Sequence, residues 1–202
     1  KNFNEANQSL NNYQRLQYRL EETGLTQAVK AVFWSQGESD GNTSTSDYVA
    51  SFESIKSQWF DDFTGLKGVY LFQTKSACSN NSLMHIKEAQ IQIADRDDRA
   101  HIIQTAALQY APPIADNIDC HFSFTGGYEE FGNRLFKLVH RDLYSGAYGD
   151  EIETPLIRRA YLENDRRLII ETDATELKLT ALVKNFQLEN AGTVQITNVS
   201  VD

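Results

Sequence analysis

Asp119 and His121 stand two residues apart, and their side chains have the chemistry needed to activate a nucleophile. A hydrolase that uses a serine needs an imidazole to accept the serine proton, and a carboxylate that holds the imidazole in the correct tautomer. A single loop could present both groups. An aspartate near a histidine is more often a surface or capping pair, so the triplet alone is a weak indication of catalysis.

A second candidate for chemistry is the segment 34–40, with the sequence WSQGESD. Gln36 could donate an amide N–H to an oxyanion, and Gly37 allows the backbone to approach a ligand closely. Glu38 could act as a base, but its charge would oppose an oxyanion beside it. We therefore expect Glu38 to make structural hydrogen bonds. The alternative interpretation is a plain loop between a strand and a helix.

Strands and helices alternate in the part of the sequence that must position these loops. Short β-rich runs predict strands at 28–34, 68–73 and 101–106, and apolar residues at helical spacing predict helices at 10–22, 47–63, 83–96 and 128–143. This order predicts an α/β fold with a parallel sheet. Functional loops in such sheets follow the carboxyl ends of the strands, where both candidate loops are expected.

Apolar faces indicate which side of each predicted helix packs inward. We interpret the stripe of helix 47–63 as core and not as a cofactor site: Tyr48, Phe52, Ile55, Trp59 and Phe60. The inward positions expected in helices 83–96 and 128–143 are Met84, Ala89, Ile91, Ala94, Phe131, Leu135, Leu138 and Val139. Ser46-Asp47 and Asn81-Ser82 are expected to cap two of these helices.

The sequence changes character after Gly149. Short β runs separated by turn residues occur at 155–157, 167–170, 177–179 and 194–196. They predict a small antiparallel β appendage at 150–202, beside a larger domain at 1–149. The appendage contains neither histidine nor cysteine, and no chemistry is apparent in it.

Composition excludes several classes of function. The 202 residues carry a formal net charge of −9, which disfavours binding to nucleic acid. No run of about 20 apolar residues predicts a membrane helix. Cys78 and Cys120 could pair in an oxidising compartment or remain free thiols. No histidine has metal-ligand spacing with a partner, so neither a metal nor another cofactor is expected.

Taken together and in this order, the two loops resemble the SGNH-hydrolase superfamily, and within it the sialate O-acetylesterases and acetylxylan esterases. In that family a strand ends in W-Y-Q-G-E-S/A-D/N, and a later D-x-H-P loop precedes a helix with G-x-R-L. The matching residues are Trp34, Gln36, Gly37, Glu38, Ser39, Asp40, Asp119, His121, Gly132, Arg134 and Leu135, and Gln73 and Ala89-Gln90 are also similar. The resemblance covers about residues 10–145.

The resemblance implies a three-layer α/β fold of the SGNH (flavodoxin-like) type and assigns roles to individual residues. His121 would be the general base and Asp119 its orienting acid. Gln36, with Gly37, would bind the oxyanion or position the substrate. Arg134 would brace the loop from its helix. The resemblance also implies a secreted or periplasmic protein.

The sequence departs from the family in ways that affect the catalytic assignment. Phe122 replaces the usual proline after the histidine, and Cys120 replaces an apolar residue. The family's nucleophile lies in a G-Q-S-N block after the first strand, and no such block occurs here. Ser9 follows a polar segment and suits a helix N-cap better. We therefore expect the fold to be incomplete at its N-terminus, with the nucleophile on an N-terminal segment outside these residues or on another polypeptide.

The expected function is a carbohydrate O-acetylesterase that cleaves an acetyl ester of sialic acid or xylan with a serine, a histidine and an aspartate. The resemblance, and not the spacing of residues, supplies this substrate class. One alternative is a non-catalytic carbohydrate-binding module on the same scaffold, which the missing nucleophile favours. Another is an esterase that acts on a lipid or a thioester.

Overall fold

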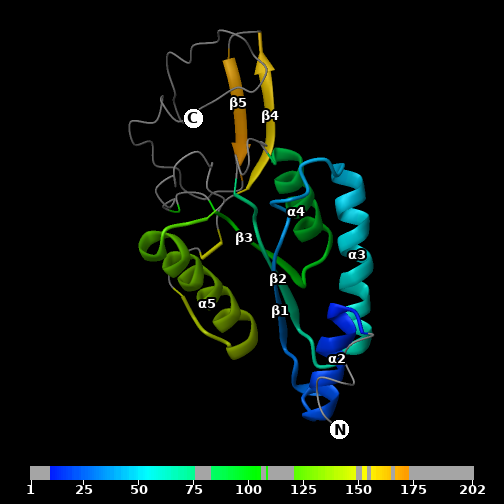
Figure 1. The fold of residues 1–202 in the computed structure, drawn as a ribbon. Coiled ribbons are helices and arrows are strands. Elements are labelled where there is room, and N and C mark those ends of the chain that lie inside the picture. Colours follow the sequence, from blue (N-terminus) through cyan, green and yellow to red (C-terminus); the bar gives the residue numbers. More distant parts are fainter. Residues whose placement is uncertain are drawn as a thin grey trace. The chain divides into compact units, whose positions relative to one another are not determined.

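The computed structural model describes residues 10–75, 83–105, 108, 121–148, 152–153, 156–164 and 167–172. They form a mixed α/β structure with a three-stranded parallel sheet and a separate two-stranded antiparallel sheet (Figure 1). The chain divides into two compact units, residues 1–153 and residues 154–202.

The parallel sheet of the first unit has the order β1-β2-β3, with β1 at Ala31–Ser35, β2 at Gly68–Phe72 and β3 at Ala100–Ile103. The three strands end in register, because Ser35 pairs with Phe72 and Phe72 pairs with Ile103. The first strand begins three residues later than its composition predicts, since a short 3₁₀ helix occupies Thr26–Ala28. The loops that follow the three strands therefore start from one edge of the sheet.

Helices α3 (Thr45–Asp62) and α4 (Met84–Arg96) cover one face of this sheet (Figure 1). Tyr48, Phe52 and Trp59 of α3 are buried in the core cluster on that face, and Ile55 and Phe60 pack against it, as predicted. Helix α2 (Asn12–Glu22) adds Tyr13 and Leu20 to the edge of the same cluster, without a fully buried residue of its own. This face holds the larger core.

The inward face of α4 is rotated from the predicted one. The buried residues are Ile86, Ala89, Gln90 and Ile93, whereas Met84 is 52% exposed and Ile91 is only half-buried. Ile86, Ala89, Gln90 and Ile93 share one side of a helix because they follow the spacing i, i+3, i+4 and i+7. The prediction was wrong because a glutamine occupies a core position, which interrupts the apolar pattern.

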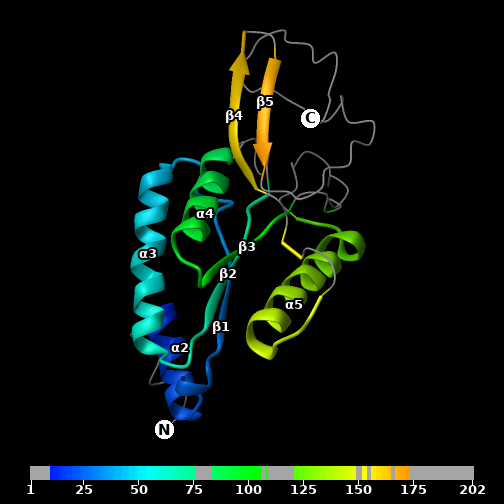
Figure 2. The ribbon, with the colours of Figure 1, turned by 180° about the vertical axis from the view of Figure 1, so that it is seen from behind.

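Helix α5 (Glu129–Tyr144) covers the opposite face, as the view from behind also shows (Figure 2). A π-helical turn at Phe124–Tyr128 precedes it. Phe131 and Leu138 are buried against Tyr70 and Ile103 of the sheet, and Leu135 and Val139 pack beside them, as predicted. The sheet is therefore enclosed between two helical layers.

One of the two predicted helix caps, that of α3, lies within the described residues. Ser44, and not Ser46, caps α3, because its side chain accepts a hydrogen bond from the backbone N–H of Asp47 at 3.1 Å. Asn81 and Ser82 lie outside the described residues, and α4 starts from Leu83, whose backbone is left-handed at φ +52°. The cap of α3 therefore lies two residues before the predicted one.

The second unit contains an antiparallel pair, β4 (Ile157–Glu163) and β5 (Arg167–Thr172). The turn between them begins at Asn164, whose φ of +53° lies in the left-handed region that asparagine tolerates better than most residues. The β runs expected at 177–179 and 194–196 lie outside the described residues.

Candidate active site

The loop after β1 is a compact turn that contains Gln36 and Gly37. The backbone N–H of Asp40 donates to the Gly37 carbonyl at 3.0 Å, and the Gln36 side-chain amide donates to the Asp40 carboxylate. One of the two amide N–H groups of Gln36 is therefore used within the loop, and a primary amide has a second one to offer a ligand. Glu38 is half-buried in the same turn.

Glycine is required at position 37 by both conformation and space. Gly37 has a φ of +132°, which residues with a side chain rarely adopt. A Cβ atom there would lie 2.5 Å from Thr74 Cγ2 and 2.9 Å from Ile86 Cγ2. The turn therefore packs its backbone directly against the end of β2 and the first turn of α4.

Two buried side chains hold the Gln36 carbonyl from the interior. The Tyr48 hydroxyl donates to it at 3.1 Å, and Gln90 Nε2 donates to it at 3.2 Å. Burial raises the pKa of Tyr48, and the negative charges of Asp40 and Glu38 raise it further. The Tyr48 hydroxyl therefore stays protonated and remains a donor at neutral pH.

Gln90 also joins the turn to the neighbouring strand. It is fully buried; its Nε2 donates to the Phe72 carbonyl at 3.3 Å, and its Oε1 accepts from the Thr74 N–H at 3.0 Å. The sequence resembles the family at Gln90, but its spacing and type gave no reason to place it at the site. A polar residue at a core position of an apolar helix face is the signal that could have found it.

Further hydrogen bonds connect the ends of β2 and β3. The Thr105 hydroxyl donates to the Thr74 carbonyl at 3.4 Å, and the Gln73 N–H donates to the Ile103 carbonyl at 3.0 Å. Arg134 of α5 donates to the Gln104 carbonyl at 2.8 Å. The predicted Arg134 thus contacts the backbone that follows β3, and its Nε lies 3.3 Å from Glu130 Oε1.

His121 is exposed and lies directly before a buried anchor residue. Phe122 is 7% exposed and packs against Phe131, with ring centroids 5.7 Å apart. Phe131 in turn packs against Phe72, the last residue of β2, with ring centroids 4.4 Å apart. His121 therefore directly precedes a residue that is linked, through Phe131, to the carboxyl end of β2. Asp119, Cys120 and Cys78 lie outside the described residues.

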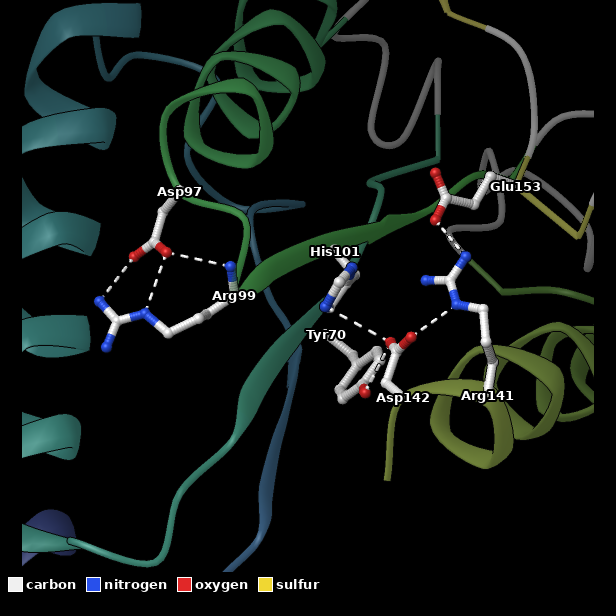
Figure 3. A network of polar contacts seen from close by, with 7 residues as sticks. All are labelled: Tyr70, Asp97, Arg99, His101, Arg141, Asp142 and Glu153. Carbon is white, nitrogen blue, oxygen red and sulfur yellow. Dashed lines mark hydrogen bonds and ion pairs between the residues drawn. The ribbon is translucent and has the colours of Figure 1, made fainter. Parts of the chain in front are cut away.

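A separate polar network attaches the C-terminal half of α5 to the sheet (Figure 3). Asp142 accepts a hydrogen bond from the Tyr70 hydroxyl, lies 3.4 Å from His101 Nε2 and pairs with Arg141 at 2.6 Å. Arg141 also pairs with Glu153 at 2.6 Å. None of these residues was singled out as part of a site from the sequence. Every charge in this network has a partner, so we interpret it as an anchor for the helix.

The described residues hold no cluster of three or more His, Cys, Asp or Glu side chains that could bind a metal ion. Within the same residues, no helix combines the length and apolar character that a membrane span requires. The site that remains is the polar junction at the carboxyl edge of the sheet, formed by Gln36, Gly37, Tyr48, Gln90 and Thr74. The chain matches neither a protein-family model nor a curated protein.

Proposed function

We propose that this chain is part of a carbohydrate O-acetylesterase of the SGNH type, with the nucleophilic serine supplied by residues outside these 202. The observation that carries the proposal is the Gln36–Gly37 turn. It follows β1 at the carboxyl edge of a parallel sheet, where ligands bind in this class of fold, and only glycine fits at position 37. The substrate class rests on the family resemblance.

The proposed reaction is an acyl transfer in two steps. The serine attacks the acetyl carbonyl while His121 accepts its proton, and Asp119 stabilises the imidazolium that forms. The Gly37 N–H and the second N–H of the Gln36 amide stabilise the tetrahedral oxyanion. The sugar hydroxyl leaves with the proton from His121, and water then releases acetate by the same route. No cofactor takes part.

Glu38 and Arg134 have supporting roles in this proposal. Glu38 is half-buried beside the turn, and its charge is close enough to raise the pKa of Tyr48. A base at this position would oppose the oxyanion, so Glu38 shapes the turn instead. Arg134 fixes the backbone after β3 through the Gln104 carbonyl. Neither residue contacts the reacting atoms in the proposed mechanism.

A non-catalytic carbohydrate-binding module is the second candidate. It is favoured by the hydrogen bond between Gln36 and the Asp40 carboxylate, which places a negative charge next to the proposed oxyanion site. Such a charge disfavours an oxyanion, whereas it can accept hydrogen bonds from sugar hydroxyl groups. An esterase for lipids or thioesters has no comparable observation in its favour.

Hydrolysis assays separate these possibilities. The 202-residue chain and the full-length polypeptide that contains it are tested with an aryl acetate, acetylated sialic acid and acetylated xylan. We expect activity only in the full-length protein, and a loss of at least a hundredfold in kcat in His121→Ala. His140→Ala is the matched control, because His140 lies near the C-terminal end of α5, stacked on Phe136.

Each outcome of these assays has a distinct meaning. Sugar binding without hydrolysis in both proteins would support the binding module. Activity of the 202-residue chain that is lost in Ser9→Ala, Ser35→Ala or Ser39→Ala would place the nucleophile within this chain. Unchanged activity in His121→Ala would remove His121 from the mechanism. Fractionation of cells that express the full-length protein tests the proposed secreted or periplasmic location.

A further inference from the structure

The orientation of the peptide between Gln36 and Gly37 is set by what holds its carbonyl oxygen. A peptide bond is planar and trans, so its C=O and N–H groups point in opposite directions. Tyr48 and Gln90 hold the Gln36 carbonyl toward the interior. The Gly37 N–H must therefore point away from both of them. Within the described residues, no group accepts a hydrogen bond from this N–H.

Two donors on one carbonyl oxygen fix the peptide plane more firmly than a single bond would. A carbonyl oxygen has two lone pairs, and Tyr48 and Gln90 together occupy both. Any rotation of the Gln36–Gly37 peptide breaks both hydrogen bonds and leaves buried donors without partners. An unsatisfied buried polar group costs about 1–3 kcal/mol.

The orientation of Gln90 itself is determined by its surroundings. Its NH₂ group faces two carbonyl oxygens, those of Gln36 and Phe72, while its oxygen faces the N–H of Thr74. A flipped amide would place an oxygen against two oxygens and an NH₂ against an N–H. Gln90 is also fully buried, so water cannot replace any of these bonds. The turn after β1 is therefore held in place by the end of β2.

We infer that Tyr48 and Gln90 are positioning residues that aim the Gly37 N–H at the substrate's carbonyl oxygen. This inference rests on the proposed esterase function, because it assigns the Gly37 N–H to an oxyanion. Oxyanion donors act by being aligned before the charge develops, so a donor that is free to rotate loses much of its effect. Neither Tyr48 nor Gln90 touches the substrate in this arrangement.

Kinetics on the full-length protein test the inference first. Tyr48→Phe and Gln90→Met keep the size of the side chain and remove the donors. We expect kcat to fall between about tenfold and a hundredfold while KM stays within about twofold. Tyr13→Phe removes another tyrosine hydrogen bond, 2.6 Å to Asp62, and Gln92→Met changes a surface glutamine of α4. Both controls should keep the kcat of the unaltered protein.

A second measurement does not depend on turnover. Sodium acetate, the product anion, is titrated into full-length protein labelled with ¹⁵N-glycine, and the Gly37 amide signal is followed by NMR. We expect acetate to shift this signal, and the dissociation constant to rise at least fivefold in Tyr48→Phe and Gln90→Met, the range of a lost hydrogen bond. Gly68, within β2, provides a reference signal.

The two measurements distinguish the failure of this inference from the failure of the proposed function. Suppose that the unaltered protein has no esterase activity, but acetate still shifts its Gly37 amide signal and binds more weakly to both variants. That result would reject the proposed function and support the positioning role. An absent shift in the unaltered protein would overturn the inference. The inference would also be overturned if both variants kept the acetate affinity of the unaltered protein. It would equally be overturned if the protein is an active esterase and both variants keep its kcat.

Discussion

The hydroxyl of Tyr70 donates a hydrogen bond to the Asp142 carboxylate at 3.0 Å, which joins the middle of the sheet to the C-terminal half of α5. Tyr70 is fully buried, and its ring stacks on that of His101, with ring centroids 5.0 Å apart. Burial raises the pKa of Tyr70, and the hydrogen bond and charge of Asp142 raise it further. The hydroxyl is therefore a permanent donor below pH 10.

Removal of this hydroxyl should destabilise the protein. We expect Tyr70→Phe to lower the free energy of unfolding by about 1–2 kcal/mol, because a hydrogen bond to a charged group is lost without a change in packing. Urea unfolding followed by circular dichroism measures the difference. Tyr144→Phe is the control, since Tyr144 is 70% exposed and should change stability by less than about 0.5 kcal/mol. Equal effects of the two substitutions would contradict the prediction.

Asp97 should make stability depend on pH in the acid range. Burial raises its pKa, but hydrogen bonds from Arg99 and the contact with Lys56 outweigh burial and hold the pKa of Asp97 well below its usual range. Lys56 Nζ lies 3.1 Å from the carboxylate, and Arg99 binds both carboxylate oxygens at 3.1 Å. A carboxyl group with a lowered pKa stabilises the fold above its unfolded-state pKa of about 4, and this contribution decreases as pH falls further.

Asp97→Asn tests this dependence on pH. At pH 7 we expect the variant to lose about 2 kcal/mol of unfolding free energy, the range of a hydrogen bond to a charged group. The difference in unfolding free energy between the unaltered protein and Asp97→Asn should decrease steadily as pH is lowered from 4 to 2. Asp98→Asn, at the exposed neighbouring aspartate, is the control and should change the unfolding free energy at pH 7 by less than about 0.5 kcal/mol. A gap for Asp97→Asn that does not change with pH would be inconsistent with a lowered pKa.

The alternation of strands and helices was predictable because each element has a regular apolar pattern. The core residues of α3 and α5 follow from that pattern, although Lys56 is also buried in α3, paired with Glu53 and Asp97. The inward face of α4 could not be found in this way, because Gln90 occupies it. Its polar groups are satisfied by the carbonyls of Gln36 and Phe72 and the N–H of Thr74, which lie 54, 18 and 16 residues away in sequence.

Tertiary contacts also decide details that local sequence leaves open. β1 begins at Ala31 because its partner β2 begins at Gly68, and the two residues pair. Ala28 belongs to the 3₁₀ helix, and Lys30 makes a single hydrogen bond towards the neighbouring chain segment, from the Lys67 N–H to its carbonyl at 2.9 Å. The Gln36–Gly37 turn was predictable as a loop with a required glycine. Its attachment to Tyr48 was not, since an aromatic residue at that spacing is equally consistent with a plain core position.

Ser44 should contribute to stability as the cap of α3. Its side chain accepts from the Asp47 N–H and also donates to the Asp47 carboxylate at 2.7 Å. We expect Ser44→Ala to lower the unfolding free energy by about 1 kcal/mol. Ser46→Ala, in the first turn of the same helix, should change it by less than about 0.5 kcal/mol. Thermal unfolding of both variants decides between the two serines, and a larger effect at Ser46 would restore it as the cap.

Two glycine-to-alanine substitutions should have opposite effects on stability. At Gly37, an added Cβ would meet Thr74 and Ile86 at less than 3 Å, and the positive φ adds strain. We expect Gly37→Ala to destabilise the protein by about 2–4 kcal/mol. At Gly132, inside α5, an added Cβ would meet nothing within 4 Å. Gly132→Ala should therefore stabilise the protein by about 0.5–1 kcal/mol, because alanine forms helix more readily than glycine.

The comparison isolates the combined effect of crowding and positive φ at Gly37, since the chemical change is the same at both positions. Urea unfolding of the two variants and the unaltered protein gives the difference. Ser39→Ala serves as a third variant, because Ser39 is exposed in the same turn and its substitution should be nearly neutral. A neutral Gly37→Ala would mean that the turn can move away from Thr74 and Ile86. Tyr48 and Gln90 would then not be holding the Gln36 carbonyl as tightly as their hydrogen bonds imply.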